Sequence, residues 1–205
     1  MQELLDMKEL FKQIIKQDVK PFFSAQGYRT KDLNFTKSED QLIYNINIQK
    51  SSGNTWDKLS FYVNCTIHST ELAQLQISQS SIVSVAGSSH FTSRIREIVP
   101  AAPDRYTLTK EVDVDSFTAE LLQHLDQALA FMYTLTDARS ILDYYMERTA
   151  LHLSEETFRF LLRAGETKTA KLYLKQLQDE YGAEPRWTIW EKKYAAIWSE
   201  YGLEL

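Results

Sequence analysis

Cysteine is almost absent from this chain of 205 residues, in which Cys65 is the only one. No disulfide can therefore form within these residues, and a reducing compartment is the expected setting. Glycine and proline are also scarce, with six and four residues respectively. Because fibrous and loop-dominated proteins use more of both, the composition favours a globular fold.

Net positive charge and long apolar runs are lacking too. The formal net charge is −5 at pH 7 and the isoelectric point is near 5.4, which disfavours a nucleic-acid-binding protein because phosphate neutralisation needs a basic surface. No run approaches eighteen apolar residues, so no membrane-spanning segment is expected. The N-terminal sequence MQELLDMKELFKQ has no apolar stretch typical of a signal peptide. We therefore expect a cytoplasmic protein that binds neither nucleic acid nor membrane.

Apolar residues are nevertheless plentiful, at 43% of the chain, and two segments arrange them by alternation. Residues 42–49 and 58–68 alternate apolar and polar side chains, which is typical of half-buried antiparallel strands. One face of this pair is apolar and the other is neutral and hydrogen-bonding. The candidate binding residues on or beside the polar face are Asn45, Asn47, Gln49, Lys50, Tyr62, Asn64 and His68.

The polar face has three interpretations. Its amides would hold a peptide or a small polar ligand through hydrogen bonds. Alternatively, it is the solvated side of an ordinary antiparallel sheet, or a helix covers it and the amides form a buried network. Asparagine is unfavourable in strands, which is why the binding interpretation is worth testing.

Helical periodicity dominates both ends of the chain. Residues 3–26 are expected to form a helix that Pro21 kinks or ends and Gly27 caps. Further helices are expected at 117–132, 141–146, 154–164, 166–181 and 185–201. Ser154 is the expected N-cap of the helix at 154–164. Short strands are plausible at 72–78, 81–85, 94–99 and 106–114.

These patterns predict an α+β protein. An antiparallel sheet should pack against the N-terminal helix and a central helix at 116–133, followed by a C-terminal helical bundle segment. The expected domains are residues 1–135, which hold the sheet, and residues 136–205, an all-helical extension packed on it.

Lysines recur every four residues on the first helix, at Lys8, Lys12, Lys16 and Lys20. Like charges at this spacing repel, so a partner with acidic groups would explain the stripe. The alternative is a solvated rim whose aliphatic stems cover apolar surface.

Arg94 and Arg96 are expected to project from one face of a strand, where they would clamp a carboxylate or a phosphate. Alternatively, they pair with Glu97, Glu111 or Asp113 on neighbouring elements.

Aromatic residues form a stripe on the last helix, at Trp187, Trp190, Tyr194, Trp198 and Tyr201. Such residues dominate both cores and interface hot spots. The stripe either docks the helix onto its neighbours, or its first four members form a partner or homodimer surface.

Catalytic and metal sites are not indicated. The four histidines are scattered, and no spacing typical of a zinc site, phosphate loop or nucleophile elbow occurs. Cys65 falls on the apolar strand face, where a thiol behaves as a small hydrophobic group. No catalytic residue, metal or cofactor is therefore expected.

Several motifs together resemble a bacterial family, the domain of unknown function family 4304. These are Lys20-Pro21-Phe22, Gly27-Tyr28, the strand from Asn45 to Ser51, the strand from Phe61 to Asn64, and Arg94 to Ile98. The likeness covers about residues 5–135. The chain departs from the pattern at Asp104-Arg105-Tyr106, where relatives often have tryptophans. The resemblance implies this architecture, a bacterial setting and, for some members, an immunity-like role in which a small protein neutralises a toxin.

The function expected from all of this is a non-enzymatic protein-binding module, immunity-like in its specific form, that acts through the polar sheet face or the aromatic stripe. The alternative is a small-ligand-binding protein or an enzyme that uses Arg94, Arg96, Tyr62 and His68 in one pocket. That alternative requires these four side chains to converge in space.

Overall fold

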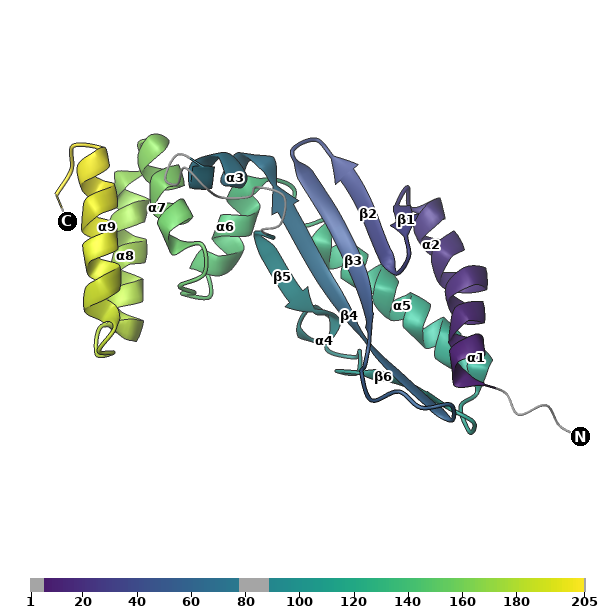
Figure 1. Ribbon diagram of the computed structural model, residues 1–205. Coiled ribbons are helices and arrows are strands. Elements are labelled where there is room, and N and C mark those ends of the chain that lie inside the picture. The colour runs from purple at the N-terminus through teal and green to yellow at the C-terminus, as the bar shows by residue number, and fades with distance from the viewer. Residues whose placement is uncertain (1–5, 78–88, 205) are drawn as a thin grey trace, which may run out of the picture. The chain divides into compact units, whose positions relative to one another are not determined.

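The computed structural model describes residues 6–77 and 89–204, and it confirms an α+β protein (Figure 1). The expected strand at 81–85 lies outside the described residues. Contacts between residues divide the chain into two compact units. The first unit contains described residues 6–68 and 91–135, and the second contains described residues 69–77, 89–90 and 136–204.

The sheet of the first unit has six antiparallel strands within the described residues. Their order is β1-β2-β3-β4-β5, and β6 pairs with β4 beyond this path. Their bounds are β1 Arg29–Lys31, β2 Asn34–Glu39, β3 Leu42–Lys50, β4 Lys58–Ser69, β5 Phe91–Arg94 and β6 Tyr106–Thr109. The alternating segments therefore form β3 and β4, as the sequence predicts.

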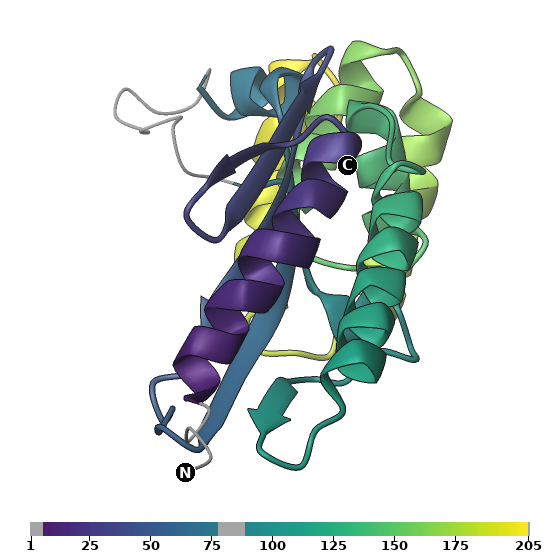
Figure 2. The ribbon, with the colours of Figure 1, turned by 90° about the vertical axis from the view of Figure 1, so that its right-hand side faces the viewer.

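Helices of the first unit cover the apolar face of the sheet. Their bounds are α1 Met7–Ile14, η1 Ile15–Val19, α2 Lys20–Ala25, α4 Ile95–Ile98 and α5 Val114–Met132. Figure 2 shows the N-terminal helix and α5 side by side on one side of the sheet. Phe61 of β4 joins both layers, with its ring centroid 5.2 Å from that of Phe11 and 6.4 Å from that of Phe117.

The N-terminal helix is continuous through Pro21 because a π turn, η1, precedes the proline. The backbone N–H of Lys20 donates to the carbonyl of Ile15, five residues earlier. Proline has no N–H to donate and crowds the preceding turn, and the wider π turn accommodates this without ending the helix.

A Schellman motif ends this helix at Gly27, which has a φ of +81°. The N–H of Gly27 donates to Ser24 at 3.0 Å, and the N–H of Tyr28 donates to Phe23 at 2.9 Å. The rings of Phe23 and Tyr28 lie 5.3 Å apart and add the apolar contact that accompanies this motif. The predicted glycine cap is confirmed.

Two of the expected strands are wrong. Residues 72–77 belong to helix α3, Thr70–Ile77, because the Ser69 hydroxyl caps it by accepting the N–H of Leu72 at 3.3 Å. In the 94–99 segment only Arg94 is in a strand, and Ile95–Ile98 form α4. Glu97 accepts the N–H of Arg94 at 3.2 Å, which favours a helical turn at this point.

The second unit contains α3 and the C-terminal helices. Their bounds are α6 Ala138–Met146, α7 Ser154–Arg163, α8 Thr167–Tyr181 and α9 Trp187–Glu200. These agree with the expected helices to within a few residues at each end. The N-cap of α7 is Leu153, whereas the hydroxyl of Ser154 lies 2.8 Å from that of Tyr194, so the expected Ser154 cap is wrong.

Candidate functional site

Polar side chains of β2, β3 and β4 form the polar sheet face, whose central residues Asn34, Thr36, Asn45, Asn47, Tyr62, Asn64, Thr66 and His68 are half-buried, while Gln49 is exposed. Cross-strand hydrogen bonds tie these side chains into rows. In the first row, Thr36 Oγ1 donates to Asn45 Oδ1 at 3.0 Å, and Asn45 Nδ2 donates to Thr66 Oγ1 at 3.3 Å. The row crosses three strands because these residues are register partners or near neighbours.

A second row lies two residues along the strands. Asn47 Nδ2 donates to Asn34 Oδ1 at 2.8 Å, and Asn64 Nδ2 donates to Asn47 Oδ1 at 3.1 Å. Asn64 also donates to Gln49 Oε1 at 3.2 Å. These bonds hold the amides in one orientation each and compensate for the low strand propensity of asparagine.

Arg94 extends this face at the end of β5, where it is the register partner of Asn64. Its guanidinium carbon lies 4.3 Å from the centroid of the Tyr62 ring, a cation–π contact. Its Nη1 atom is buried and has no hydrogen-bond partner among the residues that the structure describes. The structure thus brings Tyr62, Asn64 and Arg94 together.

Arg96 does not join them. It lies in α4, and its Nη1 donates to the carbonyl oxygen of Ala102 at 2.9 Å, so the prediction that Arg94 and Arg96 project from one strand face is wrong. His68 lies six residues along β4 from Tyr62, a separation of about 20 Å at the usual rise per strand residue. Tyr62, His68, Arg94 and Arg96 therefore do not form one pocket.

A cavity of about 600 Å³, which we call the lysine groove, lies beside the N-terminal helix of the first unit. It is lined by all four lysines of the predicted stripe and by Lys50 at the end of β3. The complete lining is Lys8, Phe11, Lys12, Ile15, Lys16, Lys20, Asp32, Leu33, Lys50, Ser51, Asn54 and Leu59.

The lysine groove is lined by exposed or half-buried lysines and by buried apolar residues, which we call its floor. Phe11, Ile15 and Leu59 are buried at 4%, 5% and 1% exposure. Within the described part of the chain, Lys12 is the only lysine of the groove in an ion pair, with Glu9 of the same helix. Sequence reasoning found the lysine stripe but missed Asp32, Leu33 and Leu59, because nothing local in the sequence connects these positions to the helix.

Lys37 of β2 is a cation that the sequence patterns did not single out as a candidate site residue. Its ammonium lies 4.9 Å from the Tyr133 ring centroid and 6.0 Å from that of Tyr28, and it pairs with Glu39 at 2.6 Å. The hydrogen bond to Glu39 raises the pKa of Lys37 above its ordinary value. The contacts of Lys37 connect β2 with Tyr133, the residue that follows α5.

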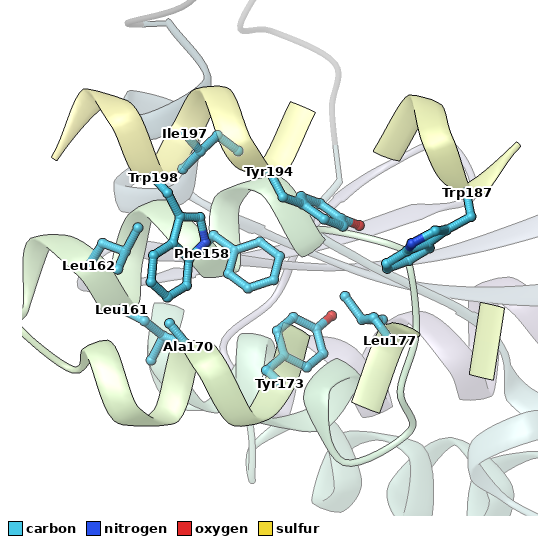
Figure 3. Close-up of a cluster of buried hydrophobic side chains, with 10 residues drawn as sticks. All are labelled: Phe158, Leu161, Leu162, Ala170, Tyr173, Leu177, Trp187, Tyr194, Ile197 and Trp198. Atoms are coloured by element: carbon cyan, nitrogen blue, oxygen red, sulfur yellow. The ribbon is translucent and has the colours of Figure 1, made fainter. Parts of the chain in front are cut away.

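The aromatic stripe of α9 is part of the core of the second unit, drawn in Figure 3. Trp187, Tyr194 and Trp198 are 5%, 0% and 0% exposed, and Trp190 is half-buried. The Phe158 ring of α7 lies 4.6 Å from that of Tyr194. Trp187, Tyr194 and Trp198 are therefore core residues of the folded unit and do not form a surface for a partner.

The single thiol is inert. Cys65 is fully buried, and burial raises its pKa to about 12, which removes the reactive thiolate at neutral pH. Among residues 6–77 and 89–204, no group of three histidine, cysteine or acidic side chains is arranged to hold a metal ion. No helix in the same ranges has both the length and the hydropathy to cross a membrane.

Comparison with known proteins agrees with the motifs. Neither the curated proteins nor the solved structures include a significant match. The model of one family, described as a domain of unknown function (DUF4304), matches residues 19–143, which covers most of the first unit and extends into α6. This match extends over more than half of the chain and confirms the resemblance, so the protein belongs to the DUF4304 family.

Proposed function

We propose that this protein is a non-enzymatic binding module whose polar sheet face receives a protein partner. The observation that carries the proposal is the pair of hydrogen-bonded rows through Asn45 and Asn47, which stay partly exposed. In the specific form of the proposal, the partner is a toxin protein that the module neutralises inside a bacterial cell.

The rows favour protein binding because their side chains are already ordered. Fixing a flexible side chain at an interface costs about 0.5–1.5 kcal/mol, and this cost is small where cross-strand bonds have fixed it beforehand. The amide oxygens and nitrogens still have hydrogen-bonding capacity toward a second molecule. Arg94, stacked on Tyr62, adds one positive charge that suits a partner carboxylate.

The enzymatic alternative has less support. It depends on Tyr62, His68, Arg94 and Arg96 acting on one ligand, and their separation along β4 and their different elements oppose this. A flat array of amides also lacks a nucleophile–base pair of the kind that catalysis needs.

Site-specific photo-crosslinking would test the proposal. Thr92 is exposed and is the register partner of Thr66, so a photoreactive residue at position 92 reports on the polar face. We expect it to capture a protein that then binds the purified chain in a 1:1 complex. The variant Asn64→Arg should weaken that complex at least tenfold, because a long cation disrupts the second row.

The matched control is Gln176→Arg at an exposed position of α8, which adds the same charge to a helix of the second unit. It should leave the affinity unchanged. The proposal fails if the captured protein binds Asn64→Arg as tightly as the parent chain, or if the probe at position 92 captures nothing while one at exposed Leu172 does.

A further inference from the structure

We propose that the lysine groove binds a small organic polyphosphate, a molecule with two or more phosphate groups beside an apolar part. This site is distinct from the polar sheet face, and the inference does not depend on the protein-binding function. Its basis is the charge, the helix geometry and the size of the groove.

The charge of the groove contrasts with that of the chain. Five lysines and one aspartate line it, whereas the whole chain has a formal net charge of −5. Like charges four residues apart on a helix destabilise it by a few tenths of a kcal/mol per pair. Within the residues that the structure describes, Lys8, Lys16, Lys20 and Lys50 have no ion pair that would offset this repulsion. An anion in the groove would do so.

The π turn keeps the lysines on the groove side of the helix. In an α-helix a spacing of four residues exceeds one turn by about 40°, so three such steps from Lys8 to Lys20 would rotate the stripe by about 120°. A π turn contains nearly one residue more than an α-helical turn. Through Ile15–Val19 a spacing of four residues therefore corresponds to nearly one full turn, and the rotation of the lysine stripe around the helix is reduced. The result is that Lys16 and Lys20 still line the same cavity as Lys8. Pro21 explains why the π turn forms, and the alignment of the lysines is its consequence.

The dimensions of the groove suit a small molecule. Its volume of about 600 Å³ lies within the roughly 300–1,000 Å³ typical of small-ligand sites. Successive lysines are anchored about 6 Å apart along the helix axis, so a chain of phosphates matches the length of the lysine stripe better than a single carboxylate does. Ammonium groups bind phosphate as point charges and need no planar geometry.

The floor of the groove indicates that the ligand has an apolar part. Phe11, Ile15 and Leu59 line the groove together with the lysines and would contact a ring or hydrocarbon portion. A long nucleic acid would extend past the groove over a chain of net negative charge, which opposes its binding. A compact ligand contacts only the basic region.

Isothermal titration calorimetry on the full chain would test the site. The probes are tripolyphosphate, adenosine triphosphate and, as a polyanion without phosphate, citrate, each in about 50 mM salt. We expect both phosphate probes to bind at least tenfold more tightly than citrate. We also expect the nucleotide to bind more tightly than tripolyphosphate, because its base and sugar cover the apolar floor.

Two groove variants and one matched control locate the binding. Lys16→Gln and Lys50→Gln should each weaken nucleotide binding by about tenfold, the typical effect of losing one charge-assisted contact. Lys175→Gln, at an exposed position of α8, should have no effect. Unchanged circular dichroism spectra of all three variants would show that the fold is intact.

Three results would overturn the inference. One is the absence of phosphate binding at millimolar probe concentration. Another is an equal loss of affinity in Lys175→Gln and the groove variants. The third is an oligoglutamate peptide or a short RNA that binds more tightly than either phosphate probe and loses affinity in Lys16→Gln. That result would assign the groove to a macromolecule.

Discussion

Buried hydroxyl and thiol groups give individual residues of this protein a defined protonation state. The Tyr194 hydroxyl lies 2.8 Å from that of Ser154 inside the helical core of the second unit, and burial raises its pKa to about 12. The Cys65 thiol, inside the first unit, is held neutral in the same way. These groups contribute to folding only while they remain protonated.

The stability of the protein should therefore decrease at alkaline pH, and Tyr194 should account for a measurable part of this decrease. Because its pKa is raised from about 10 in the unfolded chain to about 12, the contribution of Tyr194 is complete below pH 10 and is lost as the pH rises to 12. The loss is at most about 1.4 kcal/mol per pH unit in this window. Urea titrations of the parent chain and of Tyr194→Phe between pH 8 and 11.5 would measure it.

At pH 8 the variant should be less stable by about 1–2 kcal/mol, because the buried Ser154 hydroxyl loses its partner. This difference should shrink as the pH rises above 10, since only the parent chain has a tyrosine at position 194 to ionise. Curves that stay parallel up to pH 11.5 would contradict the assignment.

Helix ends and turns determine where the elements of the first unit begin and stop. The Schellman motif at Gly27 ends the long N-terminal helix and directs the chain into β1. We predict that Gly27→Ala destabilises the protein by about 1–2 kcal/mol, because a residue with a Cβ is strained at a φ of +81°. The added Cβ would lie 3.6 Å from Lys37 Cε, an ordinary contact, so the cost is conformational.

Gly53→Ala is the control for this prediction. Gly53 has no positive φ, and its added Cβ would meet no atom within 4 Å. Chemical denaturation should place this variant within about 0.5 kcal/mol of the parent chain. Equal losses in both variants would show that the left-handed conformation at Gly27 is not what the helix end requires.

The elements that sequence predicts well are those with a long, unambiguous period. Alternation placed β3 and β4 within about a residue of their observed ends, and helical spacing located α5 and the helices after it. The segment from 69 to 99 was harder, because apolar runs of four to eight residues fit a short helix as well as a strand. There the choice depends on local caps, the Ser69 hydroxyl for α3 and the Glu97 carboxylate for α4.

The candidate sites were predictable only where one element supplies the residues. Lysines four residues apart on one helix identified the stripe, and alternation identified the polar sheet face. Lys50, Leu33 and Leu59 join the groove only when the sheet forms, and Arg94 reaches Tyr62 only through the pairing of β4 with β5. Such long-range pairings leave no periodic signal in the sequence.

At the scale of the whole molecule, the two proposed binding surfaces lie in one unit and the aromatic core lies in the other. The polar sheet face and the lysine groove both belong to the first unit. The second unit has its own apolar cluster, whose ten buried residues come from α7, α8 and α9 (Figure 3). Because all ten of these residues lie within one unit, we expect disruption of the cluster to act mainly on these three helices.

Trp198→Ala tests that expectation. Trp198 is fully buried within the cluster, so its truncation should destabilise the second unit by about 3–5 kcal/mol through lost burial and a new cavity. Hydrogen exchange followed by mass spectrometry on the full chain should then show faster exchange in α7, α8 and α9. Protection in β3 and β4 should persist, because the core beneath them is made by other residues.

Trp56→Ala provides the matched comparison, since Trp56 is 55% exposed and the ammonium of Lys110 lies 3.9 Å from its ring centroid. Its loss should change stability by less than about 1 kcal/mol, the usual scale of an exposed cation–π contact, and should leave exchange in all of these helices unchanged. If Trp198→Ala instead removed protection from β3 and β4 to the same extent as from α9, the two units would unfold as one. The proposed binding surfaces of the first unit would then depend on the aromatic core of the second, and variants in that core would weaken binding through stability alone.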